Sequence, residues 1–367
     1  MGTIRLLLAA AVVLYHSFHI FGLKMTGGVV SVQAFYMISG FYMALILNEK
    51  YTARGDWKLF LTNRFLRIYP VYWVVLILVI IAGLIHHYNG GNGYFLWAWF
   101  SYFDKLHWFT IVVFILINIF LFGGDWIFFS KIGPADGLLH TASSAYWHKP
   151  HTFNFLLVPQ AWSIGAELSF YLLAPLLVKR RWWIQAIIIA GSLFYRYWLI
   201  TEAGKKWDPW NYRFFPNEIA LFMLGSLAWQ IYNRIKHIQL PKWSGPAAWS
   251  AIVALILSYN YITFIPDGKR MIAFYGLFFL LLPIIFIWSK DFKIDRWIGE
   301  LSFPLYIGHL LIIMLLRKWY FGTDLLPWFG VVSLALSLVF AWLLMKFIAQ
   351  PVERIRAARV AKRKILI

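Results

Sequence analysis

Long apolar runs separated by short polar segments set the pattern of this 367-residue chain. Ten runs have about the 20 residues that a helix needs to cross the hydrocarbon core of a membrane. They are residues 4–22, 29–47, 69–85, 159–178, 182–200, 216–232, 247–265, 271–288, 298–316 and 326–348. The pattern predicts an all-α polytopic membrane protein of about ten transmembrane helices, with residues 1–348 forming a single domain.

The apolar stretch 94–122 departs from this pattern because Asp104, Lys105 and His107 interrupt it. A single extra crossing there would reverse every later span and place the basic segment 179–181 outside. Zero or two crossings would preserve the orientation. We therefore expect an extra interfacial or re-entrant element around 94–122, within a large outward-facing region.

Composition and charge support a membrane protein and orient it. The chain is 61% hydrophobic and only 13% charged, which is too little charge to keep a soluble domain hydrated. The net charge of +19 suggests nucleic acid, but the basic residues are scattered between apolar runs, which argues against that partner. Predicted cytoplasmic segments hold 20 Lys and Arg residues, against 11 in predicted outer segments. This bias predicts that the N-terminus and the basic tail 349–367 are both cytoplasmic.

Ionisable groups inside membrane spans cost about 2.5–3.5 kcal/mol and mark functional sites by default. Four polar side chains within predicted spans are the candidates here: His16, Ser39, Glu167 and His309. Helical rise places all four in one layer, about 15–18 Å from the cytoplasmic side. Simpler interpretations stay open: His16, which the first helix is expected to bury, makes a packing hydrogen bond, and Ser39 with Gly40 permits close helix contact.

Arginines mark the cytoplasmic end of the same region. Arg5 and His16 are 11 residues apart, which is about three helical turns and puts them on one face. Arg64 and Arg67 precede the third predicted span at a spacing that places both on one side of a helix. Because guanidinium binds phosphate bidentately, the three arginines suggest a phosphate cradle. Taken singly, Arg64 and Arg67 are more often ordinary residues of the positively charged segments inside the cell.

Six motifs occur in order along the chain: Arg5 and His16 with ten residues between them, Phe35–Phe41, Arg64–Pro70, Trp162–Glu167 followed by Phe170, Tyr171 and Pro175, Phe222–Gly225, and Ser302–His309. Together they resemble the acyltransferase-3 family of membrane-bound O-acyltransferases, the type that acetylates surface glycans. Some members carry a C-terminal esterase domain of the SGNH type, whereas this chain ends in the short basic tail. The resemblance extends through most of the chain.

The resemblance implies transfer of an acyl group, usually acetyl, from cytoplasmic acyl-CoA to a hydroxyl of an extracytoplasmic or lipid-linked glycan. O-antigen and exopolysaccharide are examples of such acceptors, and the bacterial cytoplasmic (inner) membrane is the expected location. Acetyl-CoA would be a donor substrate, with no tightly bound cofactor and no metal. The family's essential residues correspond here to Arg5, His16, Arg64 and Arg67.

A mechanism follows as a hypothesis. The arginines hold the phosphates of the donor, and the thioester reaches the layer that also contains His309. His16 acts as the general base, and Glu167 orients its imidazole. Ser39 steadies the oxyanion or, less simply, acts as a nucleophile. Acyl transfer onto His16 itself, followed by a second transfer to the acceptor, is the alternative.

Two functions of other classes compete with this one. A proton-coupled membrane exporter also uses intramembrane His and Glu residues, but it predicts inverted repeats, and the two halves of the chain show no internal similarity. A glycan polymerase or flippase predicts a highly charged outer loop, whereas residues 87–158 contain three Lys and no Arg. The acyl acceptor and the oligomeric state do not follow from the sequence.

Overall fold

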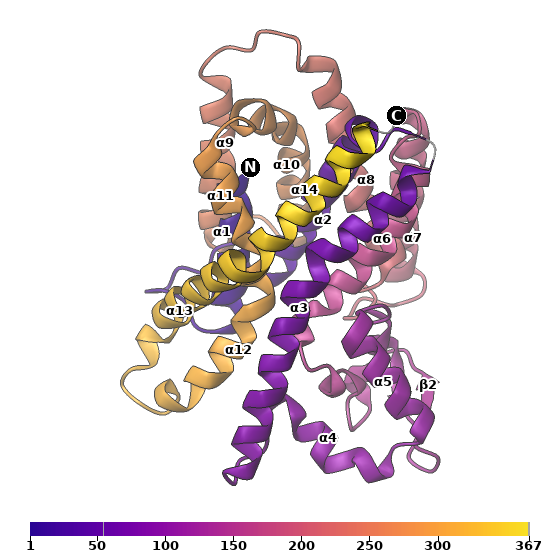
Figure 1. Ribbon diagram of the computed structural model, residues 1–367, viewed down its shortest axis with the longest axis vertical. Coiled ribbons are helices and arrows are strands. Elements are labelled where there is room, and N and C mark those ends of the chain that lie inside the picture. Colours follow the sequence, from indigo (N-terminus) through magenta and orange to yellow (C-terminus); the bar gives the residue numbers. More distant parts are fainter. Residues whose placement is uncertain (54, 366–367) are drawn as a thin grey trace. The chain divides into compact units, whose positions relative to one another are not determined.

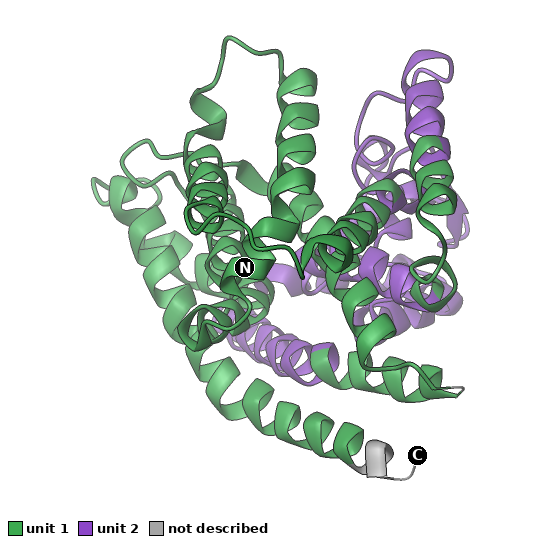
Figure 2. Cartoon of the chain, turned by 90° about the horizontal axis from the view of Figure 1, so that it is seen from above, with its two compact units in different colours: residues 1–67, 173–190, 220–367 green, residues 68–172, 191–219 purple. Residues whose placement is uncertain are grey.

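A computed structural model describes residues 1–53 and 55–365, with side chains described as far as residue 361, and helices make up nearly all of its regular structure (Figure 1). The predicted all-α class is therefore confirmed. The chain divides into two compact units (Figure 2). Unit 1 comprises Met1–Arg67, Leu173–Ala190 and Ala220–Ile367, and unit 2 comprises Ile68–Leu172 and Gly191–Ile219.

The regular elements fall into three groups. Unit 1 contains α1 (Gly2–His16), α2 (Gly27–Glu49), α9 (Ser244–Ser258), α10 (Asp267–Ser289), α11 (Lys293–Glu300), α12 (Ser302–Tyr320), α13 (Phe329–Leu344) and α14 (Gln350–Ile365). Unit 2 contains α4 (Trp97–Tyr102), α5 (Trp108–Phe120), β1 (Ser130–Ile132) and β2 (Leu139–Thr141). Four helices contribute residues to both units: α3 (Asp56–Tyr88), α6 (Trp162–Leu177), α7 (Trp182–Thr201) and α8 (Phe215–Ile235).

Helices form at every predicted span, and they identify a multi-pass membrane protein. Among the described residues, six helical segments are long and apolar enough to cross a membrane. They are Gly27–Glu49, Asp56–Tyr88, Trp182–Thr201, Asp267–Ser289, Lys293–Tyr320 and Leu326–Ala361. The total of about ten crossings and the cytoplasmic placement of both ends stay predictions.

Helices also form in two segments outside the ten predicted spans. The stretch 94–122 contains α4 and α5, and the 13 residues of α5 rise only about 20 Å, less than the about 30 Å of a hydrocarbon core. The basic tail 349–367 forms α14 up to residue 365, while residues 366–367 lie outside the described part. β1 and β2 pair antiparallel in the loop region after α5, with Lys131 opposite His140.

The first helix is shorter than its apolar run. The predicted span 4–22 is wrong at its end, because α1 stops at His16. Ser17 leaves the helical region with φ −101° and ψ −96°. Phe21 and Gly22 then adopt left-handed φ values of 46° and 88°, which turn the chain. His16 is therefore the last residue of a helix rather than one in its interior.

A hydrophobic core fixes α1 against two later helices. Ala9 and Val13 of α1 pack in one cluster with Leu305 of α12 and with Phe329 and Ala341 of α13. Each side chain is almost fully buried. The burial of these groups holds α1 in the interior of unit 1, so its polar residues keep fixed positions.

Two glycines set how closely α2 approaches α8. A Cβ on Gly40 would stand 1.8 Å from the carbonyl oxygen of Phe222, and one on Gly225 would stand 1.8 Å from that of Met37. No side chain fits at either position. The motif residues Gly40 and Gly225 therefore have a packing role, and close helix contact is confirmed for Gly40.

Two ionisable groups of unit 2 that lie within predicted spans form an ion pair. Arg196 of α7 donates to Glu218 of α8, whose side chain is fully buried. Such a pair replaces the hydration that both charges lose, and breaking it leaves one buried charge uncompensated. Arg196 and Glu218 therefore serve the structure.

We predict that Gly40→Ala destabilises the protein while Gly276→Ala does not. The new methyl group at residue 40 must displace the backbone of α8, which costs about 1–3 kcal/mol or more. Gly276 is an exposed position of α10 with nothing within 4 Å of a built Cβ. The midpoint of thermal unfolding in detergent should fall for the first variant and hold or rise for the second. Equal midpoints would refute the close contact.

Candidate active site

The start of α1 is held by a carboxylate from a distant helix. Asp295 of α11 accepts hydrogen bonds from the backbone N–H groups of Gly2 at 2.7 Å and Thr3 at 2.8 Å, and from the Thr3 hydroxyl at 2.7 Å. The first N–H groups of a helix lack partners within the helix, and its N-terminus favours negative charge. Asp295 therefore caps α1 from outside and fixes its position along α11.

At the other end of α1, His16 lies next to a histidine of α12, His309. His16 Nδ1 lies 3.3 Å from His309 Nε2 of α12, and the ring centroids are 5.1 Å apart. His309 is fully buried, whereas His16 is exposed. The expectation that α1 buries His16 is wrong, because the helix ends there and one side of its ring is left uncovered. The structure thus brings together two of the four predicted catalytic residues.

The neighbours of the two rings determine their neutral tautomers. His309 Nδ1 lies 2.7 Å from the carbonyl oxygen of Tyr306, which can only accept, so Nδ1 carries the proton and Nε2 the lone pair. His16 Nδ1 then faces two acceptors, the carbonyl oxygen of Val12 at 3.0 Å and His309 Nε2 at 3.3 Å. Neutral His16 is therefore protonated at Nδ1 and keeps its lone pair on Nε2, the atom able to accept a proton.

The segment α11–α12 contacts both ends of α1 in the same order. Asp295 contacts Thr3, and His309 contacts His16. The helical rise is about 20 Å from Thr3 to His16 and also about 20 Å from Asp295 to His309. The two segments run parallel. The predicted topology requires the first and ninth spans to cross the membrane in the same direction; parallel helices agree with that requirement, and the topology itself stays a prediction.

The predicted phosphate-binding arginines all lie in unit 1. The Nη1 atom of Arg5 lies 3.6 Å from a Cβ built on Gly299 of α11. Arg5 therefore lies close to α11, whereas Arg64 and Arg67 belong to α3.

Arg64 and Arg67 lie inside α3 and not before it. The expectation that they precede the helix is wrong, since α3 begins at Asp56 and its first turns extend beyond the apolar run. Arg64 is only 6% exposed, with its guanidinium 5.9 Å from the centre of the Phe60 ring, while Arg67 is exposed. The spacing of three residues puts both on one side of α3, as predicted.

A fourth arginine that the sequence did not single out joins them. Arg356 of α14 is 6% exposed, and the guanidinium groups of Arg64 and Arg67 repel its own. It lies four residues from Val360, which is also buried on α14. A helical pattern in the basic tail, with Arg356 on the buried face, was the signal that could have revealed it.

The remaining two predicted residues take separate places. Ser39 is buried in α2, next to the contact between Gly40 and α8. Glu167 belongs to unit 2, where its carboxylate accepts a hydrogen bond of 2.5 Å from the hydroxyl of Tyr171, one helical turn further along α6. Their catalytic roles stay predictions.

An unforeseen carboxyl group of unit 2 lies beside the motif that contains Glu167. Asp125 is buried, and burial raises the pKa of its carboxyl to about 7. Its Oδ1 atom would lie 3.2 Å from a Cβ on Gly165, so this motif glycine lets α6 approach the loop after α5. Asp125 could not be found from the sequence, because a loop aspartate is usually exposed.

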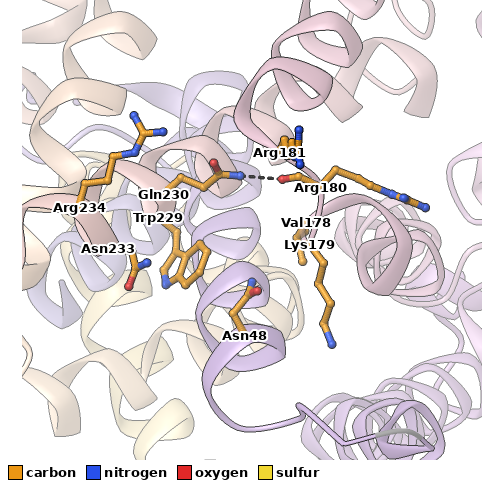
Figure 3. Close-up of a pocket in the computed structure, with 9 residues that line it drawn as sticks. All are labelled: Asn48, Val178, Lys179, Arg180, Arg181, Trp229, Gln230, Asn233 and Arg234. Carbon is orange, nitrogen blue, oxygen red and sulfur yellow. Dashed lines mark hydrogen bonds between the residues drawn. The ribbon is translucent and has the colours of Figure 1, made fainter.

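Unit 1 also contains a basic pocket (Figure 3). It measures about 240 Å³ and is lined by Asn48, Val178, Lys179, Arg180, Arg181, Trp229, Gln230, Asn233 and Arg234. Its cationic side chains point away from one another in Figure 3. Lys179 donates instead to the carbonyl oxygen of Tyr51 at 3.3 Å, and Gln230 donates to that of Arg180 at 2.9 Å. The pocket is thus a basic surface without converging charges.

Comparison with known proteins gives these motifs a context. The sequence profile of the acyltransferase-3 family, described as an acyltransferase domain, matches residues 2–346. Peptidoglycan O-acetyltransferase OatA of Listeria monocytogenes is 23% identical over an alignment of 371 positions. The alignment covers 94% of this chain and 54% of that protein. A putative O-acetyltransferase of Staphylococcus aureus is 20% identical, covering 90% of this chain and 53% of that protein. The chain therefore spans about half the length of these two relatives. No solved structure matches it.

We predict that Asp295→Asn loosens the start of α1. An amide accepts hydrogen bonds less strongly than a carboxylate and loses the favourable charge at the helix N-terminus, so stability should fall by about 1–2 kcal/mol. The matched control is Asp291→Asn, an exposed position before α11. Hydrogen exchange of the amides of residues 2–5 should accelerate in the first variant alone. Unchanged exchange there would contradict the capping role.

Proposed function

Because this chain belongs to the acyltransferase-3 family, we propose that it is a membrane O-acyltransferase. In this proposal it moves an acyl group, in the simplest case acetyl, from acyl-CoA on the cytoplasmic side to a hydroxyl of an extracytoplasmic or lipid-linked glycan. The observation that carries the proposal is the contact between His16 and His309 at the end of α1, the helix that has Arg5 near its start. A proton acceptor and a cation that suits phosphate thereby occupy the two ends of one rigid element.

Donor binding falls to the arginines. Arg5, Arg64 and Arg67 offer planar forks of donors that match phosphate oxygens and stay charged at any physiological pH. The donor's phosphates bind there, and its pantetheine arm extends along α1. The helical rise from Arg5 to His16 is about 16 Å, which a pantetheine arm in extended form can span. The thioester then lies near His16.

The chemical step needs a base at the acceptor hydroxyl. The hydroxyl oxygen attacks the thioester carbonyl carbon while Nε2 of His16 takes the hydroxyl proton. The tetrahedral intermediate collapses by breaking the carbon–sulfur bond, and the leaving thiolate takes the proton back from the imidazolium. His16 ends neutral, and the products are the acylated acceptor and free CoA.

His309 is a positioning residue in this step. Its Nε2 lone pair faces Nδ1 of His16, so it holds the tautomer that leaves Nε2 of His16 basic and stabilises the imidazolium when it forms. Ser39 stays our candidate for a donor to the oxyanion, and Glu167 for a carboxylate that assists His16. Both assignments rest on residue type and on the predicted depth of the two residues in the membrane.

The acceptor and location rest on the relatives. OatA is named for acetylation of peptidoglycan, and the staphylococcal relative is a putative O-acetyltransferase. We propose a bacterial surface glycan or its lipid-linked precursor as the acceptor and the inner membrane as the location. The chain spans only about half the length of these relatives, so the acceptor named for them comes to this chain as a proposal.

We predict that His16→Ala abolishes transfer from labelled acetyl-CoA to glycan in isolated membranes. Loss of a general base typically lowers the rate by about 10²–10⁴-fold. His19→Ala is the control, since it removes a histidine beyond the end of α1. Protein abundance should match the wild type in both variants. Acetylation at the wild-type level by His16→Ala would eliminate the base assignment.

We predict that Arg64→Gln raises the KM for acetyl-CoA by roughly tenfold or more while changing kcat little. The variant loses a charge-assisted contact that the donor makes equally in the ground state and the transition state. The control is Arg317→Gln, which removes an arginine from the last turn of α12 and should leave the KM for acetyl-CoA unchanged. A fall in kcat at unchanged KM would place Arg64 outside the donor site.

A further inference from the structure

The basic pocket of unit 1 has walls of fixed position. The turn between α6 and α7, residues 178–181, forms one wall, and the last turns of α8 form another. Gln185 of α7 donates to the carbonyl oxygens of Val178 at 3.0 Å and of Arg180 at 3.1 Å. Gln230 of α8 donates to the same oxygen of Arg180 at 2.9 Å. The turn is therefore tied to both helices, and its backbone shapes the pocket.

The pocket carries positive charge that is spread over its lining. Of its nine lining residues, none is acidic and four are cationic and exposed: Lys179, Arg180, Arg181 and Arg234. Figure 3 shows these four side chains directed away from one another, so their charges do not meet at one point. A single phosphate ion can contact only some of them. An anion with two separated phosphates matches this arrangement better, because each phosphate can pair with its own guanidinium.

Surfaces that suit lipid adjoin the pocket on both sides of the turn. Arg181 directly precedes α7, one of the helices long and apolar enough to cross a membrane. Trp182 and Trp183 at the start of α7 are exposed, as are Ile187 one turn further along and Leu176 near the end of α6. Exposed tryptophan at the end of a span is typical of the membrane–water interface. The pocket therefore lies at the level where lipid headgroups meet their acyl chains.

The predicted orientation places the pocket on the cytoplasmic side. Asn48 near the end of α2, the turn 178–181 and Arg234 in the last turn of α8 all lie at span ends that the charge bias predicts to be cytoplasmic. Anionic lipids give the cytoplasmic leaflet a negative surface potential, and basic pockets between transmembrane helices on this side bind phosphate-bearing headgroups.

We propose that this pocket binds the headgroup of an anionic phospholipid of the cytoplasmic leaflet. A headgroup with two phosphates, as in cardiolipin, fits the separated charges best. The acyl chains would lie along the exposed apolar side chains of α6 and α7. This site goes beyond the proposed function, since the donor arginines Arg5, Arg64 and Arg67 are not among its lining residues.

The test titrates the purified full-length protein in detergent with cardiolipin, phosphatidylglycerol or zwitterionic phosphatidylethanolamine, and native mass spectrometry measures the bound lipid. Cardiolipin should bind most tightly and phosphatidylethanolamine most weakly. Arg181→Gln combined with Arg234→Gln should weaken cardiolipin binding by roughly 10- to 30-fold. The matched control, Arg296→Gln combined with Arg354→Gln, removes two exposed arginines of the predicted cytoplasmic side from outside the pocket. It should bind cardiolipin as the wild type does.

A second variant tests the pocket without changing its charge. Asn233→Trp adds a large side chain at an exposed lining position of α8 and should also weaken cardiolipin binding by roughly tenfold or more. Wild-type binding by this variant would assign the lipid to the surrounding surface and overturn the pocket as its site.

Two further results would also overturn the proposal. One is equal affinity for the three lipids, or wild-type cardiolipin binding by the double glutamine variant, since either result excludes recognition of the anionic headgroup. The other is displacement of cardiolipin by excess inorganic phosphate or acetyl-CoA, which would identify a site for soluble phosphates in place of a lipid. Retention of cardiolipin in the presence of both competitors supports the lipid.

Discussion

The candidate site depends on the contacts that hold both ends of α1 in place. Asp295 holds the first residues of α1, and His309 contacts its last residue, so a single segment, α11–α12, fixes both ends of the helix. A helix between two fixed ends cannot slide or rotate freely. The positions of Arg5 and His16 therefore follow from contacts made almost 300 residues later in the chain.

The same geometry separates the cations from the proposed base. Two unit charges 4 Å apart interact with about 4 kcal/mol at an effective dielectric constant of 20, and with about 1 kcal/mol at 16 Å. Arg5 at the distance of three helical turns therefore does little to oppose protonation of His16. A long donor with phosphates at one end and a thioester at the other fits this separation. The length of α1 thus reconciles donor binding with base catalysis.

The sequence could predict the features that depend on residues close together in the chain, but not those that depend on distant ones. The all-α class, the shared face of Arg5 and His16, and the pairing of Arg64 with Arg67 on one side of α3 follow from apolar length and helical spacing. The end of α1 at His16 did not, because its apolar run continues beyond the turn. Asp295 and Arg356 were missed for a different reason: their partners lie far away in the sequence. Only the fold shows that a surface-like aspartate caps α1 and that a tail arginine is buried.

The most direct test of the central claim is a structure of the protein bound to a non-reactive thioether analogue of acetyl-CoA. We expect the phosphates of the analogue at Arg5, Arg64 and Arg67. The carbon that replaces the thioester carbonyl should lie within about 4 Å of the place where an acceptor hydroxyl oxygen can hydrogen-bond to His16 Nε2. Phosphates bound instead at the basic pocket of Lys179 and Arg181, or an acyl end far from His16, would contradict the proposed site.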